Sequence, residues 1–325
     1  MSVEVNDKLQ EWIELLRSPE VSDRLVALKT LQHLGDESAI EAVIVAVQDE
    51  NREVQHLAIS VLWEFANPIA VPALLSCLAI DDAEIRDEAL SALGELITPD
   101  HLLLLLDALQ QPDITAQKSV LILLRKIHDG QALPYILPFF QSEQSELREA
   151  AVTTLRYLNQ VDRCPPVFDL LSDPTTAVRR EVVLTLGHLT DEGVISHLTQ
   201  ALTSDPDWQV RRNAAKSLAI HGNPDALTAL STALQDDHWQ VRKFALQALQ
   251  HIPDNSLLPN LAPLLTDEFA DVRKDAAIAI GKLTTPEALN ALQPALDDPD
   301  REVSIQAERA IEKIRAAIQN VTSLS

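Results

Sequence analysis

Cysteine, glycine and aromatic residues are scarce in this sequence. Two cysteines, seven glycines and 4% aromatic residues occur among its 325 residues. Cys77 and Cys164 cannot form a disulfide framework, so a reducing, cytoplasmic environment is expected. Few glycines together with abundant alanine and leucine favour helix almost everywhere. These scarcities therefore predict a helical protein without disulfide staples.

Basic residues are also few compared with acidic ones. The chain has 26 Lys and Arg against 49 Asp and Glu, which gives a formal net charge of −23. Residues 1–162 carry 27 acidic and 11 basic residues, and the remainder carries 22 and 15. This balance argues against a nucleic-acid backbone or an anionic membrane as partner. The N-terminal half is either a surface for a basic partner or a solvated acidic surface that aids solubility.

Long apolar runs and catalytic motifs are missing as well. No run of about 18 apolar residues occurs, so no membrane insertion is expected, and Met1–Lys8 lacks the features of a signal peptide. The sequence has no glycine-rich phosphate loop, no Cys-x-x-Cys pair and no nucleophile motif. We therefore expect no catalytic residues and favour a protein that is not an enzyme.

The chain does contain an internal repeat of about 31 residues. The stretch Asp205–Leu218 recurs as Asp236–Leu249 and again as Asp267–Ile280. Such self-similarity is the signature of a stacked-repeat protein. Ten copies align on one position that is Arg in most of them, spaced 30 to 32 residues apart: Arg24, Gln55, Arg86, Ala116, Arg148, Arg179, Arg211, Arg242, Arg273 and Ser304.

Each copy has the pattern of two helices. The first carries small and aliphatic residues at helical spacing, as in Val210, Ala214 and Leu218, and a break such as Gly222-Asn-Pro precedes the second. The prediction is an all-α, right-handed α-solenoid that forms one domain over residues 1–325. Its expected parts are a leading capping helix at 5–17, ten two-helix repeats over 21–319 and a frayed tail at 320–325.

Recurring arginines and aspartates indicate a charge ladder between repeats. An acid near the start of a helix satisfies free N–H groups. The arginine that follows the valine of the repeat unit can reach an acid in its own or the next unit. We expect these side chains to be structural rather than ligand-binding. The predicted members are Arg86, Arg148, Arg179, Arg211, Arg242, Arg273, Asp173, Asp205, Asp236 and Asp267.

The unit Asp-x-x-Trp-x-Val-Arg-x-x-Ala-Ala-x-x-Leu, followed by a break and Ala-Leu-x-x-Leu-x-x-Leu-x-Asp, resembles the HEAT-like repeats of the phycobilisome-lyase type. The resemblance covers about residues 21–319. It implies an α-solenoid that binds other proteins, with second helices lining the concave side. The main hypothesis is a non-catalytic scaffold or assembly factor for other proteins, with cofactor-bearing proteins such as phycobiliproteins, or a cofactor-assembly protein, as the suggested partners. Alternatives are a bilin lyase or its subunit, a phycobilisome-degradation factor, and a partner in iron or iron–sulfur handling.

Candidate partner contacts come from aromatic and polar residues near the ends of first helices. Trp63 stands where other repeats have small or polar residues, and interfaces are enriched in Trp, Tyr and Arg. The candidates are Trp63, Phe65, Arg156, Tyr157 and His188. The apolar runs 102–106 and 135–140 are predicted to thicken the core, or to mark a binding site if they form an exposed groove. Trp208, Trp239 and Phe269 are predicted to pack between units.

Cofactor and metal sites are not expected. Cys164 is the one candidate for a transient role with a partner's cofactor, since it opens a helix beside Arg163. His33, His188 and His251 share one repeat position, but stacked units advance by roughly 10 Å, and metal–imidazole bonds need about 2 Å. No shared metal site can form from this column, so neither a metal nor a bound cofactor is predicted.

Overall fold

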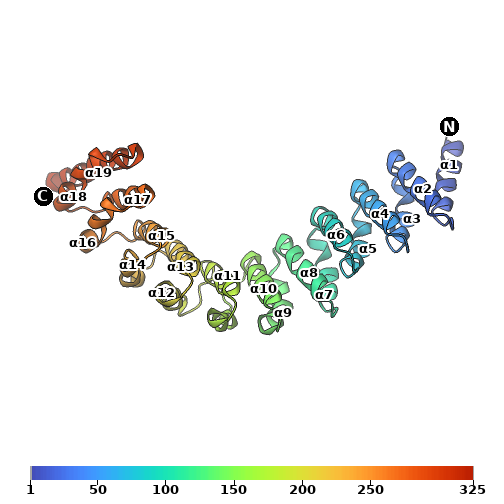
Figure 1. The fold of residues 1–325 in the computed structure, drawn as a ribbon, viewed down its shortest axis with the longest axis horizontal. Coiled ribbons are helices and arrows are strands. Elements are labelled where there is room, and N and C mark those ends of the chain that lie inside the picture. Colours follow the sequence, from blue (N-terminus) through green and yellow to red (C-terminus); the bar gives the residue numbers. More distant parts are fainter. Residues whose placement is uncertain (1, 325) are drawn as a thin grey trace. The chain divides into compact units, whose positions relative to one another are not determined.

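The computed structural model describes the backbone from Ser2 to Leu324 and the side chains of residues 8–319. The described chain is built from helices and contains no strand, which confirms the all-α prediction. Figure 1 shows the helices arranged as successive pairs along the chain. Within the described residues, no helix is both long and apolar enough to cross a membrane.

First helices of the repeats recur at the predicted period. Within residues 1–160 and within residues 161–325, each packs against the first helix of the next repeat, as α2 does on α4 and α13 on α15. The ten are α2 (Val21–Leu34), α4 (Arg52–Phe65), α6 (Ala83–Leu96), α8 (Ile114–Ile127), α10 (Ser145–Tyr157), α11 (Thr176–Leu186), α13 (Trp208–His221), α15 (Trp239–Leu249), α17 (Ala270–Ile280) and α19 (Arg301–Leu324).

Second helices are shorter and include 3₁₀ turns. They are η1 and α3 (Glu37–Ala39, Ile40–Ala46), η2 and α5 (Pro68–Ala70, Val71–Cys77), η3 and α7 (Pro99–His101, Leu102–Leu109), η4, α9 and η5 (Gly130–Ala132, Leu133–Ile136, Leu137–Gln141), η6 (Pro165–Ser172), α12 (Val194–Ser204), η7 and α14 (Pro224–Ala226, Leu227–Ala233), η8, α16 and η9 (Asn255–Leu257, Leu258–Leu261, Ala262–Thr266), and α18 and η10 (Pro286–Leu292, Gln293–Asp297).

The two ends of the chain differ from the regular pairs. Helix α1 (Ser2–Leu15) packs on α2, in the place expected for a leading helix at 5–17. The tenth repeat consists of the single long helix α19, with no second helix after it in the described chain. The expected frayed tail, 320–325, continues α19 through Leu324, and its side chains lie outside the described residues.

Local sequence explains where the helices begin and end. The side chain of Asn51 accepts hydrogen bonds from the N–H groups of Glu53 and Val54, and Asp207 does the same at the start of α13. These caps satisfy N–H groups that a helix leaves free. Gly222 ends α13 with φ of 55°, a left-handed conformation that glycine adopts without a side-chain clash.

Within each unit, residues 1–160 and residues 161–325, an apolar core runs between the paired helices. Its largest fully buried side chains are leucine and isoleucine, among them Leu31, Leu62 and Leu93, which recur at one repeat position. Small residues let neighbouring first helices approach closely: a Cβ on Gly281 would lie 2.6 Å from the Cβ of Ala310. Burial of this apolar surface, at about 25 cal/mol per Å², is the main force that holds the helix pairs together.

The chain divides into two compact units, Met1–Gln160 and Val161–Ser325. The single solenoid domain over residues 1–325 stays a prediction. The division falls in an irregular segment after α10, where Gln160 adopts a φ of 62°. Each side of this segment is tied to its own unit. The N–H of Asn159 donates to the carbonyl of His128, and the carbonyl of Asp162 accepts from the N–H of Thr190.

Candidate functional site

The predicted charge ladder is present in residues 161–325 as a run of paired arginines and aspartates. Arg211 donates to the carboxylate of Asp236 from Nε at 2.6 Å and from Nη2 at 3.0 Å. Its Nη1 donates to the backbone carbonyl of Asp205 at 2.9 Å. Each arginine therefore joins the aspartates that flank its own repeat. The Arg–Asp ladder comprises Arg179–Asp205, Arg211–Asp236, Arg242–Asp267 and Arg273–Asp298.

The other predicted ladder members make hydrogen bonds to or from backbone groups. Arg86 donates to the carbonyl of Ile80, and Arg148 to the carbonyl of Ser142, so both bind backbone oxygens. Asp173 is buried, and its carbonyl accepts from Arg179. An ion pair of the same spacing, Arg24–Asp49 at 2.7 Å, lies in residues 1–160 and was not among the predicted members.

Shallow hollows accompany the Arg–Asp ladder. Three of them lie where a second helix ends and the next first helix begins, with volumes of about 520, 400 and 420 Å³. Arg179, Arg211 and Arg273 each line one of the three. Aspartates already pair with these guanidinium groups. The hollows are therefore gaps between repeats and offer no unpaired arginine to a ligand.

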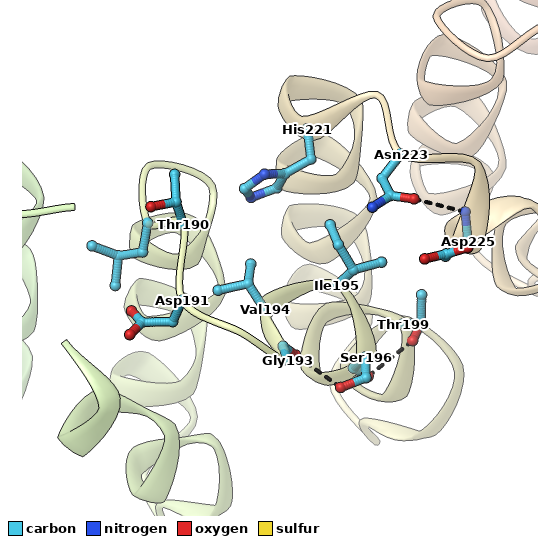
Figure 2. Close-up of a pocket in the computed structure, with 11 residues that line it drawn as sticks. Thr190, Asp191, Gly193, Val194, Ile195, Ser196, Thr199, His221, Asn223 and Asp225 are labelled. Atoms are coloured by element: carbon cyan, nitrogen blue, oxygen red, sulfur yellow. Dashed lines mark hydrogen bonds between the residues drawn. The ribbon is translucent and has the colours of Figure 1, made fainter. Parts of the chain in front are cut away.

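A larger hollow of about 590 Å³ lies between α12 and the loop that follows α13 (Figure 2). The Ser196 hydroxyl donates to the Gly193 carbonyl, and the Thr199 hydroxyl to the Ser196 carbonyl, so neither is paired with a base. Nε2 of His221 lies 2.9 Å from the Leu186 carbonyl, to which it must donate. The lining is polar, but its hydroxyls and imidazole serve the backbone, and the hollow has no nucleophile–base pair.

The structure separates the predicted partner contacts. Trp63 is half-buried, and its Nε1 donates to Oε2 of Glu95 in the next repeat at 2.8 Å. Phe65 is only 8% exposed at the end of α4, so the prediction of a surface contact is wrong for this residue. Its ring lies on the buried face of α4, because Phe65 follows the fully buried Val61 and Leu62 by four and three residues.

The remaining predicted contacts lie elsewhere. Tyr157 is 42% exposed, and the guanidinium carbon of Arg156 lies 5.6 Å from its ring centroid. Both are on α10, which is separated from the α4 of Trp63 by α6 and α8. His188 is exposed in the second unit. The candidates therefore do not form one cluster.

Apolar side chains are exposed at a place where the sequence predicted core. Leu102, Leu105 and Leu106 are buried, but Leu103 is 77% exposed and Leu104 is 41% exposed on α7. Tyr135, one repeat later on α9, is also 41% exposed. We call Leu103, Leu104 and Tyr135 the α7–α9 patch. Of the thirteen large hydrophobic side chains that are exposed in the described residues, ten lie in residues 1–160.

Both cysteine thiols are inaccessible. Cys164 is 2% exposed, and burial raises its pKa to about 11. Cys77 is fully buried, and burial likewise raises its pKa to about 11. A thiol reacts as its thiolate, so neither side chain is suited to hold a cofactor in this conformation. This burial counts against the candidate role of Cys164 with a cofactor, which stays a prediction.

One group of possible metal ligands occurs in the described residues, away from the histidine column considered above. His56, Asp82 and Glu84 each offer a ligand atom, all within 4.8 Å of one another. However, the guanidinium of Arg52 binds both carboxylates, at 3.0 Å from Asp82 and 2.7 Å from Glu84. His56 Nδ1 lies 2.7 Å from Glu88. An internal cation already neutralises this acidic cluster.

An aromatic row follows the starts of α13, α15 and α17. The rings of Trp208 and His238 stack with centroids 3.6 Å apart, and those of Trp239 and Phe269 stack at 5.0 Å. His238 and Trp239 are 6.4 Å apart. The predicted packing of the tryptophans between repeats is confirmed, while His238 was missed because its position is Asp in the repeat before it. All four rings remain partly exposed.

Comparisons with known proteins agree with this architecture. A family model described as HEAT repeats matches residues 9–94, 44–113, 71–156, 164–250 and 228–312. No curated protein matches the chain. A solved crystal structure of an engineered protein from the Northeast Structural Genomics Consortium is similar at 21% identity and a TM-score of 0.54. The match covers 94% of this chain and 98% of that one. At this identity the likeness concerns the fold alone.

Proposed function

The chain belongs to the family of HEAT repeats, and from that premise we propose that it is a non-catalytic scaffold or assembly factor that binds other proteins. Stacked repeats offer extended surfaces on which a partner can lie. The observation that carries the proposal is the α7–α9 patch. Leu103 and Leu104 belong to a run of five leucines that was predicted to be core, but both are exposed to solvent. Exposed apolar side chains grouped in this way mark interaction sites.

Charge supports a partner for this first unit. Residues 1–162 carry most of the acidic excess of the chain. Asp107, one turn after Leu103 on α7, is also exposed. A protein segment with apolar side chains flanked by Lys or Arg would complement both features. We propose such a segment as the contact of the α7–α9 patch.

The test is affinity capture from extracts of the source organism with the full-length chain, followed by mass spectrometry. Leu103→Asp with Leu104→Asp is compared with Ile220→Asp, a matched control because Ile220 is 56% exposed in the second unit. The amount of partner captured by the double variant should fall by about tenfold or more, since hot-spot side chains contribute about 2 kcal/mol or more to binding. Equal capture by both variants would contradict the proposal.

Trp63 remains a second candidate contact. Trp63→Ala removes a half-exposed ring and its hydrogen bond to Glu95. We expect reduced partner capture with unchanged helical circular dichroism, since surface substitutions usually change stability by less than ~0.5 kcal/mol. Full capture by this variant would remove Trp63 from the site.

Finer roles rest on the resemblance to phycobilisome-lyase repeats. Phycobiliproteins or a cofactor-assembly protein are the partners it suggests, and bilin attachment, phycobilisome degradation or iron–sulfur handling are the alternative activities. The buried thiols of Cys77 and Cys164 count against covalent bilin attachment through this chain. Mixing the pure protein with a bilin tests the lyase alternative: an unchanged absorption spectrum at micromolar concentration counts against it. Anaerobic reconstitution, alone and with the partner, tests iron–sulfur handling. A protein that stays colourless in both cases would count against that alternative.

A further inference from the structure

A second series of ion pairs connects successive first helices on their outer side. In each, a cation at the fifth position of one helix meets an acid at the start of the next helix. The pairs are Lys118–Glu146 at 2.5 Å, Arg180–Asp207 at 2.7 Å and Lys243–Asp271 at 2.6 Å. We call these the outer pairs. They differ from the Arg–Asp ladder, whose arginines stand one residue earlier in each helix.

Arg212 occupies the same position on α13 but has no acid opposite. The next helix, α15, begins with His238 where α13 has Asp207, and it has Gln240 where α17 has Asp271. Arg212 instead donates from Nε at 3.1 Å and from Nη2 at 2.8 Å to the side-chain oxygen of its neighbour Asn213. Among the described side chains, no carboxylate forms an ion pair with it.

The surroundings of Arg212 are unfavourable for an uncompensated cation. Burial lowers the pKa of its guanidinium, and the nearby charge of Arg180 lowers it further. Asp207 is close enough to act in the opposite direction, but its carboxylate is held by two hydrogen bonds from Arg180. A carboxylate from another molecule could therefore form charge-assisted hydrogen bonds with Arg212, because this guanidinium is partly buried and has no ion-pair partner.

Aromatic rings lie beside this arginine. Its guanidinium carbon is 5.4 Å from the ring centroid of Trp208, which stacks on His238. Trp239 follows in the same row and is partly exposed. Tryptophan and arginine together are the residues most enriched in interface hot spots. The row thus adds apolar contact area next to the charge.

We propose that Arg212, which lies over the ring of Trp208, binds a carboxylate side chain from an acidic segment of a partner protein. The incoming Asp or Glu would take the place that Asp207 and Asp271 fill in neighbouring outer pairs. Charge complementarity selects this occupant, because the guanidinium of Arg212 has no carboxylate partner among the described side chains. Lys216 is exposed one turn further along the same helix and is not part of this site. The inference rests on the proposed scaffold function and adds a surface in the second unit, whereas the α7–α9 patch belongs to the first.

The test uses the full-length protein and two dye-labelled peptides, Gly-Glu-Leu-Glu-Glu-Leu-Glu-Gly and the same peptide with Gln in place of each Glu. Fluorescence anisotropy at low salt measures binding. The Glu peptide should bind at least tenfold more tightly than the Gln peptide, as expected for charge-assisted hydrogen bonds. Arg212→Gln should remove that preference, while the matched control Lys216→Gln should change binding less than twofold.

Gln240→Glu provides a variant whose folding is not in question. The new glutamate supplies the missing acid from within the chain, at a helix start where acids are favourable. It should therefore weaken binding of the Glu peptide by about tenfold. Equal binding of the two peptides, or equal effects of Arg212→Gln and Lys216→Gln, would overturn the proposal. Leu103→Asp should leave peptide binding unchanged, so failure of the peptide test leaves the α7–α9 patch to be judged by its own experiment.

Discussion

Asp236 receives two hydrogen bonds from the guanidinium of Arg211, and its backbone carbonyl accepts a third from Arg242 at 2.8 Å. The same carboxylate accepts the N–H of His238 at 2.9 Å, which fixes the turn before α15. One aspartate thus joins the arginines of two successive repeats and shapes the loop between them. This geometry makes the Arg–Asp ladder a device that sets the register of the stack.

Asp236→Asn should destabilise the protein. The amide keeps the size of the side chain but loses the charge that holds Arg211, which is 18% exposed in the folded state. We expect a loss of about 1 to 3 kcal/mol in the free energy of unfolding, the range for hydrogen bonds to a charged group. Urea unfolding followed by circular dichroism measures it. Glu146→Gln, in an exposed outer pair, should have little effect, and equal losses would contradict the assignment.

Acid should weaken the second unit through its paired aspartates. The hydrogen bond from Arg273 lowers the pKa of Asp298, and that from Arg180 lowers the pKa of Asp207. A lowered pKa stabilises the fold above the unfolded value, about pH 4, and this contribution is lost as pH falls through the folded value. When melting temperatures are measured from pH 7 to pH 2.5, they should decrease once the pH falls below about 4. Arg273→Gln should flatten this drop; an identical profile would refute the linkage.

Asp275 should behave in the opposite way. Burial raises the pKa of this side chain, which is 5% exposed and accepts a hydrogen bond from Gln247. A raised carboxyl pKa means that folding favours the protonated form, so this contribution is present at low pH and is lost as pH rises through the folded value. Asp275→Asn should therefore raise the melting temperature at pH 7 and lose that advantage near pH 4. A lower melting temperature at pH 7 would contradict the account.

Two glycines in first helices should respond oppositely to alanine. A Cβ at Gly281 would lie 2.6 Å from the Cβ of Ala310 on α19, so Gly281→Ala should cost about 1 to 3 kcal/mol by forcing helices apart. Gly94 has nothing within 4 Å of an added Cβ, and Gly94→Ala should gain about 0.5 to 1 kcal/mol. Thermal unfolding compares them. A stabilising effect of alanine at both sites would show that α17 and α19 are not in close contact.

The repeat period and the Arg–Asp spacing made the helical stack and most of the ladder predictable. Each ladder arginine recurs at a fixed distance from its aspartate, so Arg179, Arg211, Arg242 and Arg273 could be assigned from the pattern. The exposure of Leu103 and Leu104 could not. A run of five leucines carries no helical phase, and the 3₁₀ turn at Pro99–His101 sets which of them face the core.

The candidate sites depended on pairings that spacing alone does not show. Trp63 and Tyr157 share a chemistry that favours interfaces, but α6 and α8 lie between their helices, so they could not form one cluster. The unpaired state of Arg212 became visible only when the partners of Arg180 and Lys243 were known. The prediction that Phe65 lies on the surface was wrong, because Phe65 follows the buried Leu62 by three residues, a spacing that puts both side chains on one helix face.

The central claim is that a partner protein lies on the α7–α9 patch. Hydrogen-exchange mass spectrometry of the full chain, with and without a captured partner, tests this most directly. The account predicts slower exchange in the partner-bound state for peptides that cover Leu102–Leu109 and Leu133–Ile136, with the Leu103→Asp and Leu104→Asp variant showing no change. Unaltered exchange in both peptides, with protection confined to other helices, would contradict it.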